Sequence, residues 1–372
     1  MRITVVHGIC VRNDAISNAI ADNIGWLRSA GHEVVLFAYA CEHADVPHRL
    51  VRDATDIMGD PHFQASDVVI FHFGIYYPLF DLIMMVPARA RRLVVFHNIT
   101  PKQFVDAGHH ATIDKSFAQL GNVMFADYVA CDSASNLEVL RAAGVSTPGS
   151  VLPLAVHGQA QASAAKPGRS DGIVRLVFIG RMVRSKGVAD LLDAVARCLQ
   201  ADSGVRIAFD LVGNLGFSDP ALVAAVRAAA DEWPRLYGER VSVRLHGDAP
   251  EELKQRLLVE GDVFVLPTYH EGFCVPIVEA LSAGCRVVCY DNSNTPAISG
   301  GFARLVPTGE VGQLAQAIGD ELALVRSAQW QAGGFAAFAA RSWRYAQTFA
   351  PARARYRLTA LVADLVNGVV DH

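Results

Sequence analysis

Two glutamates separated by seven residues are the side chains of this sequence best suited to hold a ribose and a sugar. Glu271 and Glu279 lie in the segment from Val263 to Gly284, V-F-V-L-P-T-Y-H-E-G-F-C-V-P-I-V-E-A-L-S-A-G. A carboxylate accepts two hydroxyl hydrogen bonds at once, so Glu279 suits a ribose diol and Glu271 suits the hydroxyl groups of a sugar. A charge near a helix start that favours the helix dipole is the alternative for either glutamate taken alone.

The same segment predicts an anion site. It reads as a buried strand, a tight loop at Gly272 and a helix with Pro276 in its first turn. The first backbone N–H groups of a helix have no intrahelical partner, and such a terminus attracts phosphate.

A second segment supplies positive charge. In F-I-G-R-M-V-R-S-K-G, from Phe178 to Gly187, a strand ends at Gly180 and the next helix begins near Lys186. Arg181 and Lys186 therefore stand at a strand exit and a helix entrance, where two cations neutralise a departing diphosphate. Taken alone, this segment could be a solvated basic loop. The two segments together indicate a donor site, that is, a site for a sugar linked to a diphosphate.

The elements that position these residues form two series of alternating strands and helices, which predict parallel sheets covered on both faces. The strands of the first series are expected at 3–6, 34–39, 68–73, 93–96 and 128–131, with a helix over 15–30 closed by Gly31. Those of the second are expected at 176–179, 207–212, 241–245, 263–266, 287–290 and 304–306.

The predicted fold is α/β, with two doubly wound Rossmann-like domains facing a cleft. Residues 1–160 form the first domain, residues 173–345 form the second, and residues 346–372 form a C-terminal helix that packs back on the first domain. The small and polar residues from Gly158 to Gly172 indicate a linker about which the domains close.

Composition excludes several classes of protein. The 372 residues are 52% hydrophobic and 19% charged with a net charge of −4, which argues against a disordered chain and against nucleic acid as the main partner. No apolar run approaches the roughly twenty residues of a membrane span, so we expect a cytoplasmic protein. The cluster Arg89, Arg91 and Arg92 is a candidate contact with an anionic membrane face, and a solvated helix end is its alternative.

These motifs resemble family four of the retaining GT-B glycosyltransferases, of the type that assembles bacterial surface polysaccharides. Gly180, Arg181 and Lys186 match the family's diphosphate-binding G-R-x-x-x-x-K-G segment, and Glu271 and Glu279 match its pair of glutamates. In the first domain, His97 of F-H-N-I-T-P matches the histidine that the family places beside the transferred sugar.

The resemblance implies that residues 1–160 are the acceptor domain and residues 173–345 the donor domain, and it implies a role for each matching residue. The catalytic residues it implies are His97, Arg181, Lys186 and Glu271. The donor-binding residues it implies are Gly8, Gly180, Arg181, Lys186, Gly213, Gly272, Phe273, Cys274, Val275 and Glu279. His72 also ends a strand, but we rank it below these residues.

The implied reaction moves a hexose from a nucleotide diphosphate sugar, of the GDP-mannose or UDP-hexose type, to a glycan or lipid-linked glycan at the inner face of the membrane. We expect no cofactor and no metal, since no Asp-x-Asp motif stands near a strand end. Two departures bear on donor and acceptor: Gly8 stands alone where many members have a Gly-Gly pair, and Ala297 replaces a common glutamate. A nucleotide-sugar epimerase, a glycan phosphorylase and an inactive GT-B scaffold are the alternatives, although no motif for a phosphorylase's cofactor lysine is found.

Overall fold

The protein, analysed as a computed structural model, divides into two compact units. The structure describes residues 1–12, 14–166 and 172–369. The first unit contains Met1–Ala155 together with the described part of the segment that begins at Pro351, and the second unit contains Val156–Ala350. The first unit is therefore built from the two ends of the chain.

The first unit contains a seven-stranded parallel sheet in the order β5-β3-β1-β6-β7-β8-β9. Its strands are β1 (Arg2–Val6), β3 (Glu33–Ala38), β5 (His48–Leu50), β6 (Val68–Phe73), β7 (Arg91–Phe96), β8 (Tyr128–Cys131) and β9 (Gly149–Val151). Strand order reverses between β1 and β6, and ligands of open parallel sheets bind at such a reversal, beyond the carboxyl ends of the strands. A separate two-stranded sheet pairs β2 (Ile9–Cys10) with β4 (Ala40–Cys41).

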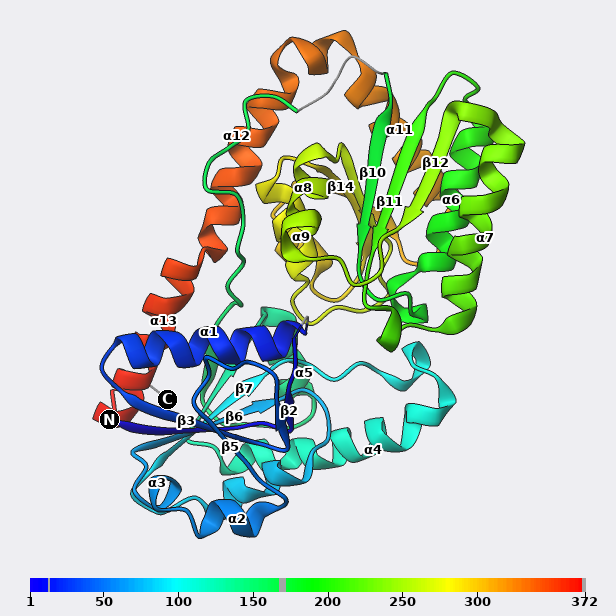
Figure 1. Cartoon of the computed structure of the whole chain (residues 1–372). Helices are drawn as coiled ribbons and strands as arrows, with labels where there is room; N and C mark the ends of the chain where they lie inside the picture. Colours follow the sequence, from blue (N-terminus) through cyan, green and yellow to red (C-terminus); the bar gives the residue numbers. More distant parts are fainter. Residues whose placement is uncertain (13, 167–171, 370–372) are drawn as a thin grey trace. The chain divides into compact units, whose positions relative to one another are not determined.

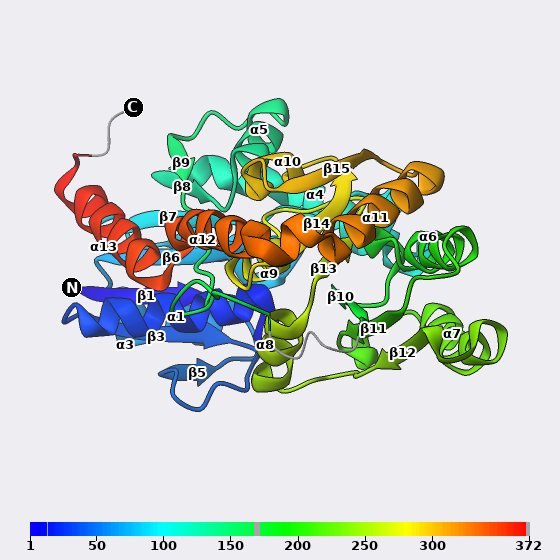
Figure 2. The ribbon, with the colours of Figure 1, turned by 90° about the horizontal axis from the view of Figure 1, so that it is seen from above.

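Helices from both ends of the sequence cover one face of this sheet. Helix α1 (Ala15–Ser29) begins at Asp14, whose side chain accepts a hydrogen bond from Ser17 N, and the chain turns away at Gly31, where φ is +84°. Helix α13 (Pro351–Asn367) lies beside α1 (Figures 1 and 2). Leu358 and Val362 of α13 share a buried cluster with residues of α1 and the strands.

The opposite face is covered by short helices. They are α2 (Ala54–Met58), α3 (Pro61–Gln64), α4 (His110–Gln119), α5 (Ala134–Ala142) and the 3-10 helices η1 (Pro78–Met85) and η4 (Leu120–Phe125). Phe63, Phe80 and Leu140 pack there against the strands. Every residue of β6 is buried, as expected of a central strand with both faces covered.

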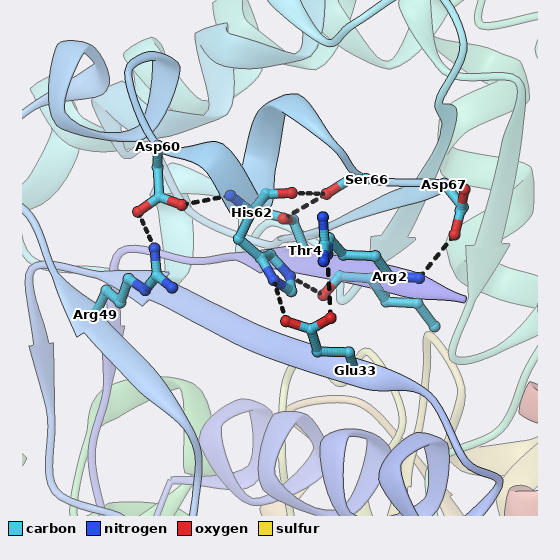
Figure 3. A network of polar contacts seen from close by, with 9 residues as sticks. Arg2, Thr4, Glu33, Arg49, Asp60, His62, Ser66 and Asp67 are labelled. Carbon is cyan, nitrogen blue, oxygen red and sulfur yellow. Dashed lines mark hydrogen bonds and ion pairs between the residues drawn. The ribbon is translucent and has the colours of Figure 1, made fainter.

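A polar network around His62 joins α3 to strands β1 and β3 (Figure 3). The buried His62 ring contacts the Ile3 carbonyl through Nε2 at 3.0 Å and Glu33 through Nδ1 at 3.3 Å. Glu33 also pairs with Arg2 at 3.1 Å. The backbone N–H of His62 donates to Asp60 at 2.8 Å. The network therefore joins two strands and a helix through one imidazole.

We predict that His62→Ala lowers the free energy of unfolding by about 2 to 4 kcal/mol, because it opens a cavity and leaves a buried carbonyl without its partner. Urea unfolding followed by circular dichroism measures the change. The control is His109→Ala, whose exposed side chain should alter stability by no more than about 0.5 kcal/mol. Equal effects of the two substitutions would contradict the structural role of His62.

The second unit contains a six-stranded parallel sheet in the order β12-β11-β10-β13-β14-β15. Its strands are β10 (Val174–Ile179), β11 (Ile207–Val212), β12 (Val241–Leu245), β13 (Val263–Leu266), β14 (Arg286–Asp291) and β15 (Ala303–Pro307). Strand order reverses between β10 and β13, the two strands that carry the strongest motifs.

Helices again cover both faces of the second sheet, with α6 and α7 on one face and α8 and α9 on the other (Figure 1). The helices are α6 (Val188–Ala201), α7 (Pro220–Tyr237), α8 (Glu251–Glu260), α9 (Val275–Ser282), α10 (Thr295–Ser299), α11 (Val311–Arg326) and α12 (Phe335–Ala346). Among the residues that the structure describes, no helix combines the length and the apolar character that a bilayer span requires. The predicted class of two doubly wound α/β domains is confirmed.

The segment expected to be a linker is held to the rest of the second unit at several of its described residues. Gln159 N donates to Ser282 Oγ at 2.7 Å, and Lys166 Nζ donates to the Ala283 carbonyl at 2.9 Å. The segment approaches so closely at Gly158 that a Cβ there would lie only 2.3 Å from Ser282 Oγ, so a larger residue would clash. Gly158, Gln159 and Lys166 thus contact the rest of the second unit, whereas 167–171 lie outside the described residues.

Candidate functional site

Three loops of the second unit meet where its strand order reverses, and glycines allow the approach. Gly187 ends the loop after β10 with φ of +66°, and a Cβ there would lie 2.0 Å from the Pro267 carbonyl oxygen. Gly213 follows β11, and its Cβ would lie 2.0 Å from the Gly180 carbonyl oxygen. The Tyr269 N–H donates to the Ser185 carbonyl at 2.8 Å. The loops after β10, β11 and β13 are therefore fixed against one another.

Lys186 and Glu271 form an ion pair at this junction. Lys186 Nζ lies 2.5 Å from Glu271 Oε1, and the two side chains are 20% and 9% exposed. Gly180 lies next to the Lys186 side chain, since a Cβ at Gly180 would be 3.8 Å from Lys186 Cδ. Arg181 is exposed at the exit of β10. The structure thus brings one cation and one carboxylate of the predicted site into contact, with the second cation on the same loop.

The turn from Gly272 to Val275 leads into α9. Cys274 has φ of +80°, a left-handed conformation that costs a non-glycine residue about 1–3 kcal/mol and is most often retained at functional sites. Asn294 Nδ2 donates to the Phe273 carbonyl at 2.8 Å and holds the turn. Within the described part of the chain, the N–H groups of Phe273, Cys274 and Val275 donate to no residue. They are available to an anion, because the first N–H groups of a helix have no partner within it.

Glu279 lies one turn into α9 and is paired with a lysine that sequence reasoning missed. Lys254 Nζ contacts Glu279 Oε1 at 2.8 Å and Glu251 Oε2 at 2.9 Å. Burial raises the pKa of Glu279 above its usual value, and Lys254 opposes that shift. Burial lowers the pKa of Lys254, but the two glutamates outweigh it and raise that pKa. Nothing in the charged sequence of α8 singles out Lys254 in advance.

A second shared carboxylate supports the loop that carries Glu271. Asp190 accepts hydrogen bonds from the hydroxyl groups of Tyr269 and Tyr290, each at 2.6 Å. Burial and Asp190 together raise the pKa of Tyr269 to about 12, so its hydroxyl remains a donor at neutral pH. Asp190 thereby ties α6 to the loop after β13.

A buried aspartate in β11 supports the loops that follow β11 and β12. Asp210 contacts His246 Nε2 at 2.7 Å and Arg244 Nε at 2.9 Å. The Gly213 N–H donates to the Gly247 carbonyl at 3.0 Å. The loops after β11 and β12 therefore lie together, next to Gly180.

The two predicted site residues of the first unit occupy different environments. His97 follows β7, and both of its ring nitrogens are engaged: Nδ1 contacts Asp132 at 2.7 Å and Nε2 contacts His72 Nδ1 at 2.8 Å. Gly8 is buried after β1, and a Cβ there would lie 3.2 Å from Tyr77 Cβ. Asp132 was missed, although its position directly after a predicted strand marks it in the sequence.

The predicted donor residues of the second unit therefore gather at one sheet edge. These are Gly180, Arg181, Lys186, Gly213, Glu271, Gly272, Phe273, Cys274 and Val275, with Glu279 farther along α9. Their roles in binding and catalysis stay predictions, as do those of His97 and Gly8 in the first unit.

Comparisons of the sequence give matches over part of the chain. Residues 174–323 match the family model described as Glycosyl transferases group 1. A segment of 125 residues, 33% of the chain, is 31% identical to the O-antigen chain mannosyltransferase B of Escherichia coli and covers 30% of it. A segment of 143 residues, 38% of the chain, is 28% identical to the putative teichuronic acid biosynthesis glycosyltransferase TuaC of Bacillus subtilis (strain 168) and covers 31% of it. The matches thus span under a third of the length of these curated relatives.

Solved structures resemble the chain over nearly its whole length. A glycosyltransferase from Rickettsia africae ESF-5 has a TM-score of 0.73 at 12% identity, covering 98% of each chain. The sucrose-phosphate synthase of Thermosynechococcus elongatus has a TM-score of 0.69 at 16% identity, covering 98% of this chain and 99% of the other. The fold is that of the GT-B glycosyltransferases. At such low identity, the likeness to these GT-B structures extends to the fold alone.

We predict that Gly187→Ala weakens binding of a nucleotide sugar about tenfold or more, because its Cβ must displace the Pro267 carbonyl and with it the loop that carries Glu271. Isothermal titration calorimetry with GDP-mannose measures the change. Gly301→Ala is the matched control, since Gly301 has a similar φ of +79° but no atom within 4 Å of its would-be Cβ. If the two variants bind equally well, close packing at Gly187 does not shape the donor site.

Proposed function

We propose that the protein is a retaining glycosyltransferase that moves a hexose from a nucleotide diphosphate sugar to a glycan or lipid-linked glycan. The observation that carries the proposal is the position of the Lys186–Glu271 pair at the strand-order reversal, next to the open N–H groups of Phe273 to Val275. That edge offers a cation, a carboxylate and a helix start within one set of fixed loops. A diphosphate sugar carries the complementary groups, which are phosphate oxygens and sugar hydroxyls.

In the proposed reaction, the bond between the anomeric carbon and the diphosphate breaks, and negative charge grows on the leaving oxygens. Arg181, Lys186 and the N–H groups of the turn stabilise that charge without a metal ion, through groups already oriented before the reaction. Glu271 holds hydroxyl groups of the transferred sugar. Its contact with Lys186 keeps both side chains in place before the donor arrives.

Glu279 binds the ribose in this proposal. Lys254 contacts one oxygen of the Glu279 carboxylate. A ribose diol therefore either shares the carboxylate with Lys254 or displaces Lys254 from it. Because Lys254 also contacts Glu251, it keeps a carboxylate partner when the donor binds.

The donor we favour is GDP-mannose. One curated relative is named as a mannosyltransferase of O-antigen chains and the other as a putative glycosyltransferase of teichuronic acid biosynthesis. Both names are consistent with transfer to a growing bacterial polysaccharide. Retention of anomeric configuration rests on the resemblance to family four.

The alternatives remain a nucleotide-sugar epimerase and an inactive scaffold of the same fold. An epimerase alters GDP-mannose without releasing GDP, and a scaffold does neither. Release of GDP that depends on an added mannose oligosaccharide therefore separates transfer from both alternatives, and the anomeric configuration of the product tests retention.

We predict that Glu279→Ala weakens GDP-mannose binding about 10- to 100-fold, because hydrogen bonds to a charged group contribute roughly 1.5–3 kcal/mol. Lys186→Ala should mainly lower kcat, by about 100-fold, since its charge acts most on the leaving group. Calorimetry and initial rates of GDP release measure the two effects.

The controls for these variants are Glu252→Ala and Lys115→Ala, which remove exposed charges of the same kind elsewhere. If Glu279→Ala binds GDP-mannose as tightly as the wild type and Lys186→Ala releases GDP at the wild-type rate, the proposed donor site is wrong.

The proposed lipid-linked acceptor requires peripheral contact with a membrane, and the first unit has a surface suited to it. Met84, Met85, Met124 and Phe125 are 48%, 55%, 61% and 51% exposed. They lie on η1 and η4, which contact each other, and the exposed Arg89 follows η1 in the chain. We call Met84, Met85, Met124 and Phe125 the methionine patch and propose that it inserts between anionic lipids, with Arg89 at the headgroups.

The other two arginines of the predicted basic cluster have structural roles. Arg91 and Arg92 begin β7, so the alternative of a solvated helix end is wrong. The Arg92 N–H donates to Asp127 Oδ2 at 2.7 Å, and Arg91 lies 3.8 Å from the same carboxylate. The Arg92 guanidinium donates to the Val86 carbonyl at 3.3 Å, so among the described residues Arg91 is the one arginine of the three that forms an ion pair.

We predict that Met85→Ser combined with Met124→Ser reduces binding to vesicles containing phosphatidylglycerol at least about threefold, because less apolar surface leaves water on insertion. Cosedimentation with vesicles measures the bound fraction. Leu236→Ser, which removes a 70% exposed leucine from the second unit, is the control. Equal binding by wild type and the double variant would refute a membrane role of the methionine patch.

A further inference from the structure

Two cysteines of the first unit lie opposite each other in the small parallel sheet formed by β2 and β4. The register pairs Cys10 with Cys41. Register partners on neighbouring parallel strands have their side chains on the same face, and such strands lie about 4.8 Å apart. Disulfide bridges join residues whose Cα atoms are roughly 4.4–6.8 Å apart. The backbone therefore holds the two thiols at a separation that a disulfide can bridge.

Hydrogen bonds fix this register on both sides of the cysteines. The Tyr39 N–H donates to the Gly8 carbonyl, and the Glu42 N–H donates to the Cys10 carbonyl, each at 2.8 Å. The Arg12 N–H donates to the Glu42 carboxylate at 3.0 Å. The loops after β1 and β3 are thus already joined, so a bridge between the two thiols requires little movement of the backbone.

The other contacts of the two thiols are weak. Cys10 Sγ donates to the Ser17 carbonyl and Cys41 Sγ donates to the His43 carbonyl, each at 3.7 Å. A thiol is a weak donor, so little stabilisation is lost when these contacts break. Burial raises the pKa of Cys10 to about 12, and the Cys41 thiol adds to this shift, in part through a hydrogen bond between the two side chains.

The two cysteines differ in their access to solvent. Cys10 is buried, whereas Cys41 is partly exposed. The remaining five cysteines all belong to the described part of the chain and are all buried: Cys131, Cys198, Cys274, Cys285 and Cys289. A dissolved oxidant therefore reaches Cys41 first. Cys10 needs no such access, because it reacts with the sulfur that lies beside it.

We propose that Cys10 and Cys41 form a reversible disulfide, and that this bond fastens the loop after β1 to the loop after β3. The oxidant is a small disulfide such as oxidised glutathione. The bond lies beyond the carboxyl end of β1, one of the two strands between which the strand order reverses, where ligands of such sheets bind. The redox state of the two thiols thereby sets the freedom of a loop at this edge of the first unit.

The exchange proceeds in two balanced steps. The Cys41 thiolate attacks one sulfur of oxidised glutathione, the S–S bond of the glutathione breaks, and one glutathione thiolate leaves and takes up a proton. The Cys10 thiolate then attacks Cys41 Sγ and displaces the second glutathione in the same way. Each cysteine sulfur loses one electron, and the two electrons are found in two molecules of reduced glutathione.

Mass spectrometry of the full chain tests the bond. The protein is incubated with oxidised glutathione at about pH 8.5, because thiolates are the attacking species, and is then denatured in acid and alkylated with N-ethylmaleimide. We expect two of the seven cysteines to escape alkylation, and trypsin to release residues 3–12 joined to residues 29–49. Dithiothreitol should restore both thiols. Alkylation of Cys10 and Cys41 after this treatment, or a glutathione adduct that persists on Cys41, would overturn the proposal.

Substitution of each cysteine tests the order of the two steps. Cys10→Ser should stop at a mixed disulfide between Cys41 and glutathione, and Cys41→Ser should form neither this adduct nor the internal bond. The matched control is Cys198→Ser, which removes a buried thiol of the second unit and should leave the bond unaffected. Absence of the adduct in Cys10→Ser would refute the attack by Cys41.

Thermal unfolding tests whether the bond fastens the two loops. Oxidation of the wild type should raise the Tm of the first unit by about 5 °C or more, because the bond restricts the unfolded chain between residues 10 and 41. Differential scanning calorimetry measures the shift. The same oxidant should leave the Tm of Cys41→Ser in place. A disulfide that forms without any change of Tm would contradict the fastening of the loops.

Discussion

The close approach of the Gly187 backbone to the Pro267 carbonyl is the contact on which the candidate donor site depends. It places the loop after β10 directly against the loop after β13, and so brings Lys186 to Glu271. A side chain at position 187 would separate the two loops. The position also requires a left-handed φ, so steric and conformational constraints both select glycine.

Around that contact, further interactions fix the parts of the site separately. Asp190 holds the loop after β13 through two tyrosine hydroxyl groups, and Asn294 holds the turn at Phe273. The left-handed Cys274 between them stores strain that these supports maintain. The N–H groups of the turn are thereby oriented before any ligand binds, which is what stabilisation of a leaving anion requires.

Much of this could be predicted from the sequence, because the buried strands are continuous apolar runs and the site residues follow them directly. The predicted strand over 68–73 coincides with β6, and that over 207–212 with β11. Strands β5 and β9 escaped prediction because three residues with exposed positions give no apolar pattern. The segment from Gly158 onward looked like a linker because small residues mark both flexible chains and close packing. Lys254 was missed since its partner Glu279 lies 25 residues away in the sequence. Asp132 could have been found, because it directly follows a predicted strand.

The first unit is built from two segments of the chain that are separated in the sequence by the whole second unit. Leu358, Val362 and Leu365 of α13 complete an apolar cluster with residues near the opposite terminus. During synthesis on the ribosome, the strands before residue 155 emerge long before α13 does, and the whole second unit is translated in between. Part of the first sheet's apolar face therefore stays uncovered until α13 has been translated. A nascent chain of this architecture is exposed to chaperones and to aggregation for longer than one whose domains are each continuous in sequence.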